Sequence, residues 1–163
     1  MSQTAIYPGT FDPITLGHVD IVTRASRLYS RVILAIVRSP NKQTYLTLDE
    51  RIDLAQASLA HLKNVEIEPF DGLIVNFAQQ HQAPVLIRGL RATSDFEYEF
   101  MMSQMNKMLN PQIETMFMMA GLDYQFLSSS LVKEVSSLGG DVSRLVPSEV
   151  FRHLEFKLNN LED

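Results

Sequence analysis

The residues with the clearest chemical potential stand where the chain passes from its first predicted strand to its first predicted helix. The short apolar run Ala5–Tyr7 is typical of a buried strand, and the amphipathic segment Val19–Leu28 is typical of a helix. Between them, the stretch Thr10–His18 ends in Gly17 and His18. In an open α/β sheet, phosphates bind beside such a turn because helix-start N–H groups point at the anion. His18 can donate a hydrogen bond to a phosphate and, when protonated, oppose charge that develops on it.

Two arginines after a later apolar run form a second group of candidate ligands. Arg88 and Arg91 stand on either side of Gly89. A guanidinium can bind two phosphate oxygens at once, and a glycine lets backbone approach a ligand closely. The alternative is an ordinary surface turn whose arginines pair with Asp95 and Glu97. We favour a phosphate site, because the carboxyl ends of parallel strands share one edge of a sheet and bring this turn beside the first one.

Consecutive serines form the third group. Ser128, Ser129 and Ser130 precede an apolar helical pattern, so they offer hydroxyl groups and helix-start N–H groups to an anion. Plain N-capping of that helix is the alternative, and the serines alone do not decide between the two.

One face of a predicted helix carries methionines beside an amide. Residues at helical spacing share this face: Tyr98, Met102, Met105, Asn106 and Leu109. Methionine in such a pattern commonly fills a core. An amide on an apolar face, however, needs a hydrogen-bond partner, which an amide-bearing ligand could supply.

The bulk composition excludes several classes of protein. The 163 residues suffice for one domain, which we place at 1–163, and the net charge of −5 argues against a general nucleic-acid binder. There are no cysteines, so disulfides and thiolate metal sites are excluded. We see no apolar run long enough for a membrane span and no secretory signal, and we therefore expect a cytoplasmic protein that binds no membrane.

Apolar runs alternate with helical patterns along the whole chain, and this order predicts the elements that position the three groups. We expect strands at Ala5–Tyr7, Val32–Val37, Val65–Phe70, Val85–Arg88 and Thr115–Met119. Capping boxes at Thr47–Glu50 and Ser94–Glu97 predict helices that run to about Leu62 and Leu109, and Pro147–Leu161 reads as a terminal helix. The fold class is therefore α/β, with a five-stranded parallel sheet, helices on both faces and a dinucleotide-binding-like (Rossmann-like) arrangement.

The motifs resemble those of a known enzyme superfamily. Thr15-Leu16-Gly17-His18 is similar to the T/HxGH signature of the nucleotidylyltransferases. The serine string departs from the usual ISSTxxR pattern, with Lys133 where arginine is common. The strings YPGTFDPITLGH, LIRGLRATSDFEYE and SSSLVKE, in this order, resemble the phosphopantetheine adenylyltransferases of bacterial coenzyme A synthesis more narrowly.

The resemblance implies a reaction and a role for each residue. Such enzymes transfer the adenylyl group of ATP to 4′-phosphopantetheine, giving dephospho-coenzyme A and pyrophosphate. Direct in-line attack by a phosphate that is already ionised needs no covalent intermediate. The implied catalytic residues are His18, Thr10, Lys42 and Arg91. The implied ATP ligands are Thr10, Phe11, His18, Gly89, Arg91, Glu99, Tyr124, Leu127, Ser128, Ser129 and Ser130. The implied phosphopantetheine ligands are Thr10, Lys42, Ile74, Arg88 and Asn106.

The sequence also leads to expectations about the cofactor and the oligomeric state. We expect Mg²⁺ to arrive with ATP, held by phosphates and water rather than by a dedicated cage of protein ligands. The resemblance implies a homohexamer. Two rival interpretations remain open: a nucleotidylyltransferase that acts on glycerol phosphate or nicotinamide mononucleotide, and a nucleotide-binding module without catalytic activity.

Overall fold

The computed structural model describes residues 3–38, 43–91 and 93–160, without the side chains of residues 93–95. Strands and helices alternate as the sequence predicts. In chain order the elements are β1 (Thr4–Gly9), α1 (Leu16–Leu28), β2 (Arg31–Val37), α2 (Leu48–Leu59), β3 (Val65–Phe70), α3 (Ile74–Gln80), β4 (Val85–Leu90), α4 (Thr93–Leu109), β5 (Glu114–Met119), a short 3₁₀ turn η1 (Leu122–Tyr124), α5 (Ser129–Ser137) and α6 (Ser148–Asn159).

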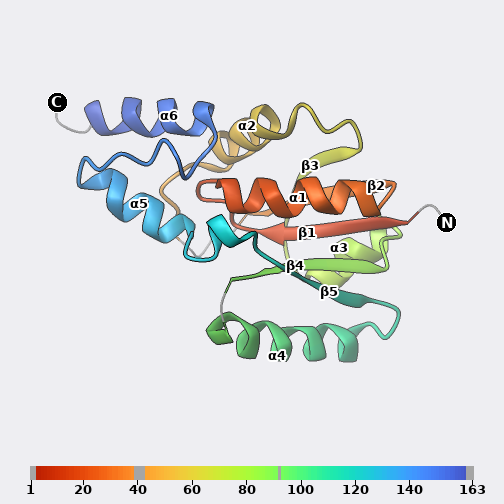
Figure 1. Cartoon of the computed structure of the whole chain (residues 1–163). Coiled ribbons are helices and arrows are strands. Elements are labelled where there is room, and N and C mark those ends of the chain that lie inside the picture. The colour runs from red at the N-terminus through yellow and green to blue at the C-terminus, as the bar shows by residue number, and fades with distance from the viewer. Residues whose placement is uncertain (1–2, 39–42, 92, 161–163) are drawn as a thin grey trace.

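The strands form one parallel sheet of five strands in the order β3-β2-β1-β4-β5 (Figure 1). The chain starts at the centre of the sheet, builds outward to β3 and then crosses over to β4 on the other side of β1. The switch point therefore lies between β1 and β4, where ligands bind in open α/β sheets. This arrangement confirms the predicted fold class.

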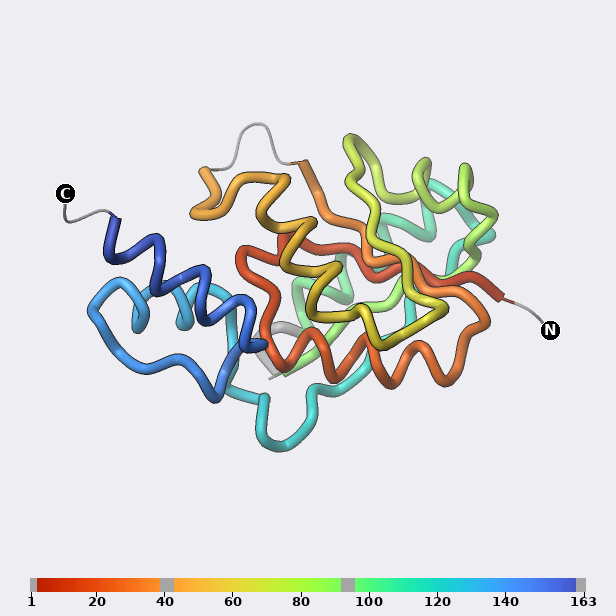
Figure 2. Tube along the Cα trace, turned by 90° about the horizontal axis from the view of Figure 1, so that it is seen from above, coloured from red at the N-terminus to blue at the C-terminus, as the bar shows by residue number. Residues whose placement is uncertain are grey.

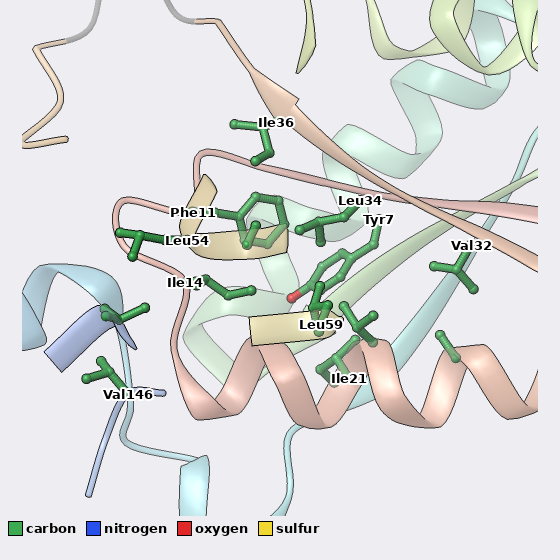
Figure 3. Close-up of a cluster of buried hydrophobic side chains, with 14 of the residues drawn as sticks. Tyr7, Phe11, Ile14, Ile21, Val32, Leu34, Ile36, Leu54, Leu59 and Val146 are labelled. Carbon is green, nitrogen blue, oxygen red and sulfur yellow. The ribbon is translucent and has the colours of Figure 1, made fainter. Parts of the chain in front are cut away.

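Alternation along β1 divides the core between the two faces of the sheet. Ala5 and Tyr7 are buried in the larger apolar cluster, with α1, α2, α5 and α6. Ile6 belongs to a smaller cluster with α3 on the opposite face. Figure 3 shows part of the larger cluster, with Tyr7 beside Leu34 above Ile21 of α1. Helices thus cover both faces, and the central strands are buried on both sides.

The predicted capping boxes have different outcomes. The Thr47 hydroxyl accepts from the Glu50 N–H, and the Glu50 carboxylate accepts from the Thr47 N–H, as expected for a capping box. Helix α4 begins at Thr93, one residue before the predicted cap, and the side chain of Ser94 lies outside the described residues. The C-terminal end of α4 at Leu109 agrees with the prediction.

The methionine face of α4 does not fill the core. Tyr98 is 60% exposed, Met102 39% and Met105 47%. Figure 1 shows why: α4 lies along the outer side of β5, at the edge of the sheet. The core-filling alternative is therefore excluded for these side chains within this chain.

Two helices extend beyond the sheet at the end toward which β1 runs. Helices α5 and α6 lie side by side there, away from the N-terminal end of the chain (Figures 1 and 2). Val132 of α5 and Val150 of α6 both join the larger apolar cluster. The start of α5 therefore faces the carboxyl end of the sheet. No helix in the described ranges is both long and apolar enough for a membrane span.

Candidate active site

A cavity of about 540 Å³ opens at the carboxyl ends of β1 and β4. This volume lies in the range typical of small-molecule sites. The three sequence groups meet on its wall although they are far apart in the chain. The predicted residues that line it are Thr10, Phe11, His18, Arg88, Gly89, Arg91, Glu99, Tyr124, Leu127, Ser128, Ser129 and Ser130.

Two of the predicted site residues that the structure describes lie away from this wall, and a third falls outside the described residues. Lys42 lies outside the described residues. Ile74 begins α3 and packs against the smaller apolar cluster, and Asn106 lies in the last third of α4. Neither lines the cavity. Their contact with an acceptor stays a prediction.

His18 is held in one orientation by the turn that precedes it. The backbone N–H of Thr15 donates to His18 Nδ1 at 3.0 Å, and the Thr15 hydroxyl accepts from the His18 N–H at 3.4 Å. Because the backbone N–H can only donate, Nδ1 must accept, and the proton of the neutral ring sits on Nε2. The imidazole therefore presents an N–H donor on its other side, and it lines the cavity.

The charge state of His18 follows from its surroundings. Burial, helped by the nearby Arg91 guanidinium, lowers the pKa of His18 from 6.5 to about 4. The unliganded protein thus carries a neutral imidazole at pH 7. Its first contribution to a phosphate is a hydrogen bond, and an arriving polyphosphate would favour protonation.

Two glycines make room for aromatic side chains at the cavity. A Cβ on Gly9 would lie 2.9 Å from the ring of Phe11, which itself has a positive φ of 50°. A Cβ on Gly89 would lie 3.1 Å from the Tyr7 hydroxyl. The close approach at Gly89 is therefore to a side chain of β1, a reason that the sequence does not reveal.

The Arg88 guanidinium has an acidic partner that the surface-turn alternative did not name. Its Nε donates to Glu99 Oε2 at 2.7 Å, its Nη2 donates to Glu99 Oε1, and its Nη1 donates to the Pro8 carbonyl at 2.9 Å. The Arg91 Nη1 donates to the Leu127 carbonyl at 3.1 Å. Each arginine thus ties β4 or its following turn to another wall of the cavity.

The serines combine capping with a position on the cavity wall. Ser128 is the N-cap of α5, and its hydroxyl accepts from the Leu131 N–H at 3.0 Å. The Ser129 hydroxyl donates to the Pro13 carbonyl at 2.8 Å. The capping alternative is confirmed for Ser128, and the first turn of α5 still offers N–H groups to an anion at the cavity.

The charges on the wall oppose the charge of the whole chain. Arg88, Arg91 and Lys133 face two acids, Asp12 and Glu99, although the chain as a whole is at −5. Both acids are already paired, Asp12 with Lys133 and Glu99 with Arg88. The described residues contain no group of three histidine or acidic side chains arranged for a metal.

Sequence reasoning missed Asp12 and Lys133 as residues of this cavity. Both occur within the quoted motif strings, and Lys133 stands at the position where arginine is common in the superfamily. The ammonium of Lys133 lies 2.7 Å from Asp12 Oδ2. Only the folded chain shows that pairing, because the two residues stand 121 positions apart in the sequence.

Comparison with known proteins identifies a family and a shared fold. The family described as cytidylyltransferase-like matches residues 6–135. A structure assigned as a nicotinate-nucleotide adenylyltransferase from Vibrio parahaemolyticus superimposes with a TM-score of 0.67 at 18% identity, covering 94% of this chain and 99% of its own. The structure of nicotinic acid mononucleotide adenylyltransferase of Plasmodium falciparum, complexed with NaAD, superimposes with a TM-score of 0.71 at 14% identity. The match covers 98% of this chain and 97% of the Plasmodium chain. At these low sequence identities, the similarity shows only that the folds are alike.

Proposed function

This chain belongs to the cytidylyltransferase-like family of nucleotidyltransferases, and we propose that it transfers the adenylyl group of ATP to 4′-phosphopantetheine, with dephospho-coenzyme A and pyrophosphate as products. The observation that carries the proposal is the meeting of all three motif groups around one cavity. The choice of acceptor rests on the strings LIRGLRATSDFEYE and SSSLVKE, which resemble those of phosphopantetheine adenylyltransferases.

The proposed step is a direct displacement at the α-phosphorus. An oxygen of the acceptor phosphate forms a bond to the α-phosphorus, the bond between that phosphorus and the bridging oxygen to the β-phosphorus breaks, and pyrophosphate leaves with the electron pair. The attacking phosphate is already ionised at neutral pH, so no general base is needed. The protein then contributes positioning and charge stabilisation.

The donors of the cavity suit this task. The Nε2–H of His18 and the guanidinium of Arg91 can meet oxygens on which charge increases, and the first turn of α5 can hold the leaving pyrophosphate. Thr10 lies at the end of β1, where we place the reacting centre between the two substrates. We assign Lys42 to the acceptor phosphate by resemblance.

Magnesium fits this cavity as a companion of the nucleotide. The two lining carboxylates, Asp12 and Glu99, are engaged by Lys133 and Arg88. The metal, when bound, would neutralise phosphate charge and be held by phosphate oxygens and water. The amide of Asn106 and the side chain of Ile74 are proposed contacts for the pantetheine arm. A homohexamer is proposed by resemblance.

A pyrophosphate-release assay with purified protein and Mg²⁺ tests the proposal. ATP is combined in turn with 4′-phosphopantetheine, nicotinate or nicotinamide mononucleotide, and glycerol phosphate, and CTP replaces ATP in a parallel series. We expect release only with ATP and 4′-phosphopantetheine, and ATP formation when dephospho-coenzyme A is mixed with pyrophosphate. A faster reaction with a mononucleotide would show that the acceptor is a mononucleotide and not 4′-phosphopantetheine. Nucleotide binding without release under any combination would favour a binding module.

A further inference from the structure

A buried carboxylate next to Thr10 joins three segments of the chain. Asp12 is 4% exposed, yet it accepts three hydrogen bonds. Its Oδ1 accepts from the Leu46 N–H at 2.8 Å, and its Oδ2 accepts from the Tyr45 N–H at 2.9 Å and from Lys133 Nζ at 2.7 Å. The loop after β1 is thereby fastened both to the residues that lead into α2 and to α5.

A buried guanidinium holds the same loop from the other side. Arg51 of α2 is 2% exposed, and its Nη1 donates to the carbonyls of Thr10 at 2.9 Å and Val37 at 3.0 Å. Its Nε has no hydrogen-bond partner among the described residues. Removing a cation from water costs several kcal/mol, so an apolar side chain would be the simpler choice for packing alone. Arg51 instead links the carboxyl ends of β1 and β2.

We propose that Asp12 and Arg51 are positioning residues for nucleotidyl transfer, which fix Thr10 between the end of β2 and helix α5. The inference rests on the proposed function, which places Thr10 between the two substrates. The Arg51 guanidinium acts at the first residue of the loop between β1 and α1, and the Asp12 carboxylate acts two residues later in the same loop. Arg51 does not line the cavity and acts through the Thr10 carbonyl. Asp12 acts through the N–H groups of Tyr45 and Leu46 and through Lys133.

This assignment also gives Lys133 a role. Its ammonium donates to Asp12 Oδ2 at 2.7 Å and so links α5 to the loop that carries Thr10. Lys133 therefore helps to fix the position of α5 relative to Thr10. Such positioning matters because misplacing a reacting group by about 1 Å can lower a rate on the order of 100-fold.

The kinetic test compares variants that remove these contacts with variants that only destabilise the protein. The first group is Asp12→Asn, Arg51→Met and Arg51→Lys. The controls are Phe77→Leu, in the smaller cluster on the opposite face of the sheet, and Asp53→Asn, at an exposed position of α2. Initial rates of pyrophosphate release are measured well below each variant's unfolding midpoint.

We expect kcat to fall about 10- to 100-fold in Asp12→Asn and Arg51→Met, while KM for ATP changes less than about 2-fold. The kcat of Arg51→Lys should be about 10-fold higher than that of Arg51→Met, since an ammonium can also donate to two carbonyls. Phe77→Leu should lower the midpoint temperature and leave kcat unchanged. If kcat falls no further in the first group than in Phe77→Leu, the two residues are merely structural and the inference is overturned.

A second measurement needs no substrate. Amide hydrogen exchange of Tyr45 and Leu46 reports directly on the bonds to Asp12, and we expect it to accelerate about 10-fold or more in Asp12→Asn but not in Asp53→Asn. Unchanged exchange would show that the carboxylate does not hold this segment. An inactive wild-type protein would overturn the proposed function. Active wild type with unimpaired variants would overturn this inference alone.

Discussion

Arg88 and Glu99 form a two-pronged ion pair that ties β4 to α4 at the wall of the cavity. Both carboxylate oxygens accept from the same guanidinium, whose remaining arm reaches the Pro8 carbonyl of β1. The Arg88 side chain is 30% exposed and that of Glu99 13%. The pair is therefore partly shielded from solvent, and Arg88 has in Glu99 an acidic partner that the sequence alternative did not name.

Glu99→Gln should destabilise the protein by about 1–2 kcal/mol, because it leaves a partly buried guanidinium without its charged partner. Urea unfolding measures the loss. The matched control is Glu114→Gln, which removes the partner of Lys107 at a position whose side chain is 66% exposed. That control should cost less than about 0.5 kcal/mol. Equal losses in the two variants would mean that the Arg88 pair is an ordinary surface contact.

His18→Ala should lower kcat by about 100- to 1000-fold, because it removes a donor aimed at developing charge. ATP binding, measured by calorimetry, should weaken far less, since Arg91 and the start of α5 remain. His61→Ala, at an exposed position, is the control and should match the wild type. Full activity of His18→Ala would remove His18 from the reaction.

Arg91→Lys should raise KM for ATP while the protein keeps its fold. A lysine acts as a point charge, whereas the guanidinium can contact the Leu127 carbonyl and a phosphate at once. Arg27→Lys, on the exposed side of α1, should have no effect on KM. Circular dichroism checks the fold of both variants. Unchanged nucleotide kinetics in Arg91→Lys would assign Arg91 to the structure of the turn alone.

His18 should make the protein less stable in mild acid. Its pKa is about 4 in the folded protein, against 6.5 as the ordinary value. Between these values the unfolded chain binds a proton that the folded chain does not, so stability falls as pH drops from 6.5 to 4 and this contribution levels off below 4. Well above pH 6.5 the residue contributes no pH dependence, because the imidazole is neutral in both states.

Urea unfolding at pH 7 and pH 4.5 tests whether the free energy of unfolding falls in acid as predicted. The loss from His18 should be about 2 kcal/mol, reduced from the full shift because the ring is only partly buried. His18→Gln should show a smaller loss between the two pH values than the wild type. The same loss in both proteins would show that another group dominates the acid sensitivity.

Much of the candidate site could be anticipated because its residues cluster in short strings at the ends of predicted strands. Thr10 directly follows β1, and His18 lies in the first turn of α1. Arg88 lies in β4, and Arg91 directly follows it. Neighbouring parallel strands bring their carboxyl ends to one edge of the sheet. Asp12, Lys133 and Arg51 could not be assigned a task in this way. Their contacts join residues 14 to 121 positions apart, and a single sequence holds no local signal for such pairs.

The sequence by itself determined the alternation of strands and helices, since apolar runs and capping residues act locally through the backbone. It also determined the chemistry available at the turns. Only the tertiary structure decided the protonation of His18, because that depends on burial and on Arg91. Only the tertiary structure placed the methionine face of α4 at the surface, because exposure depends on where a helix lies relative to the edge of the sheet and not on its pattern.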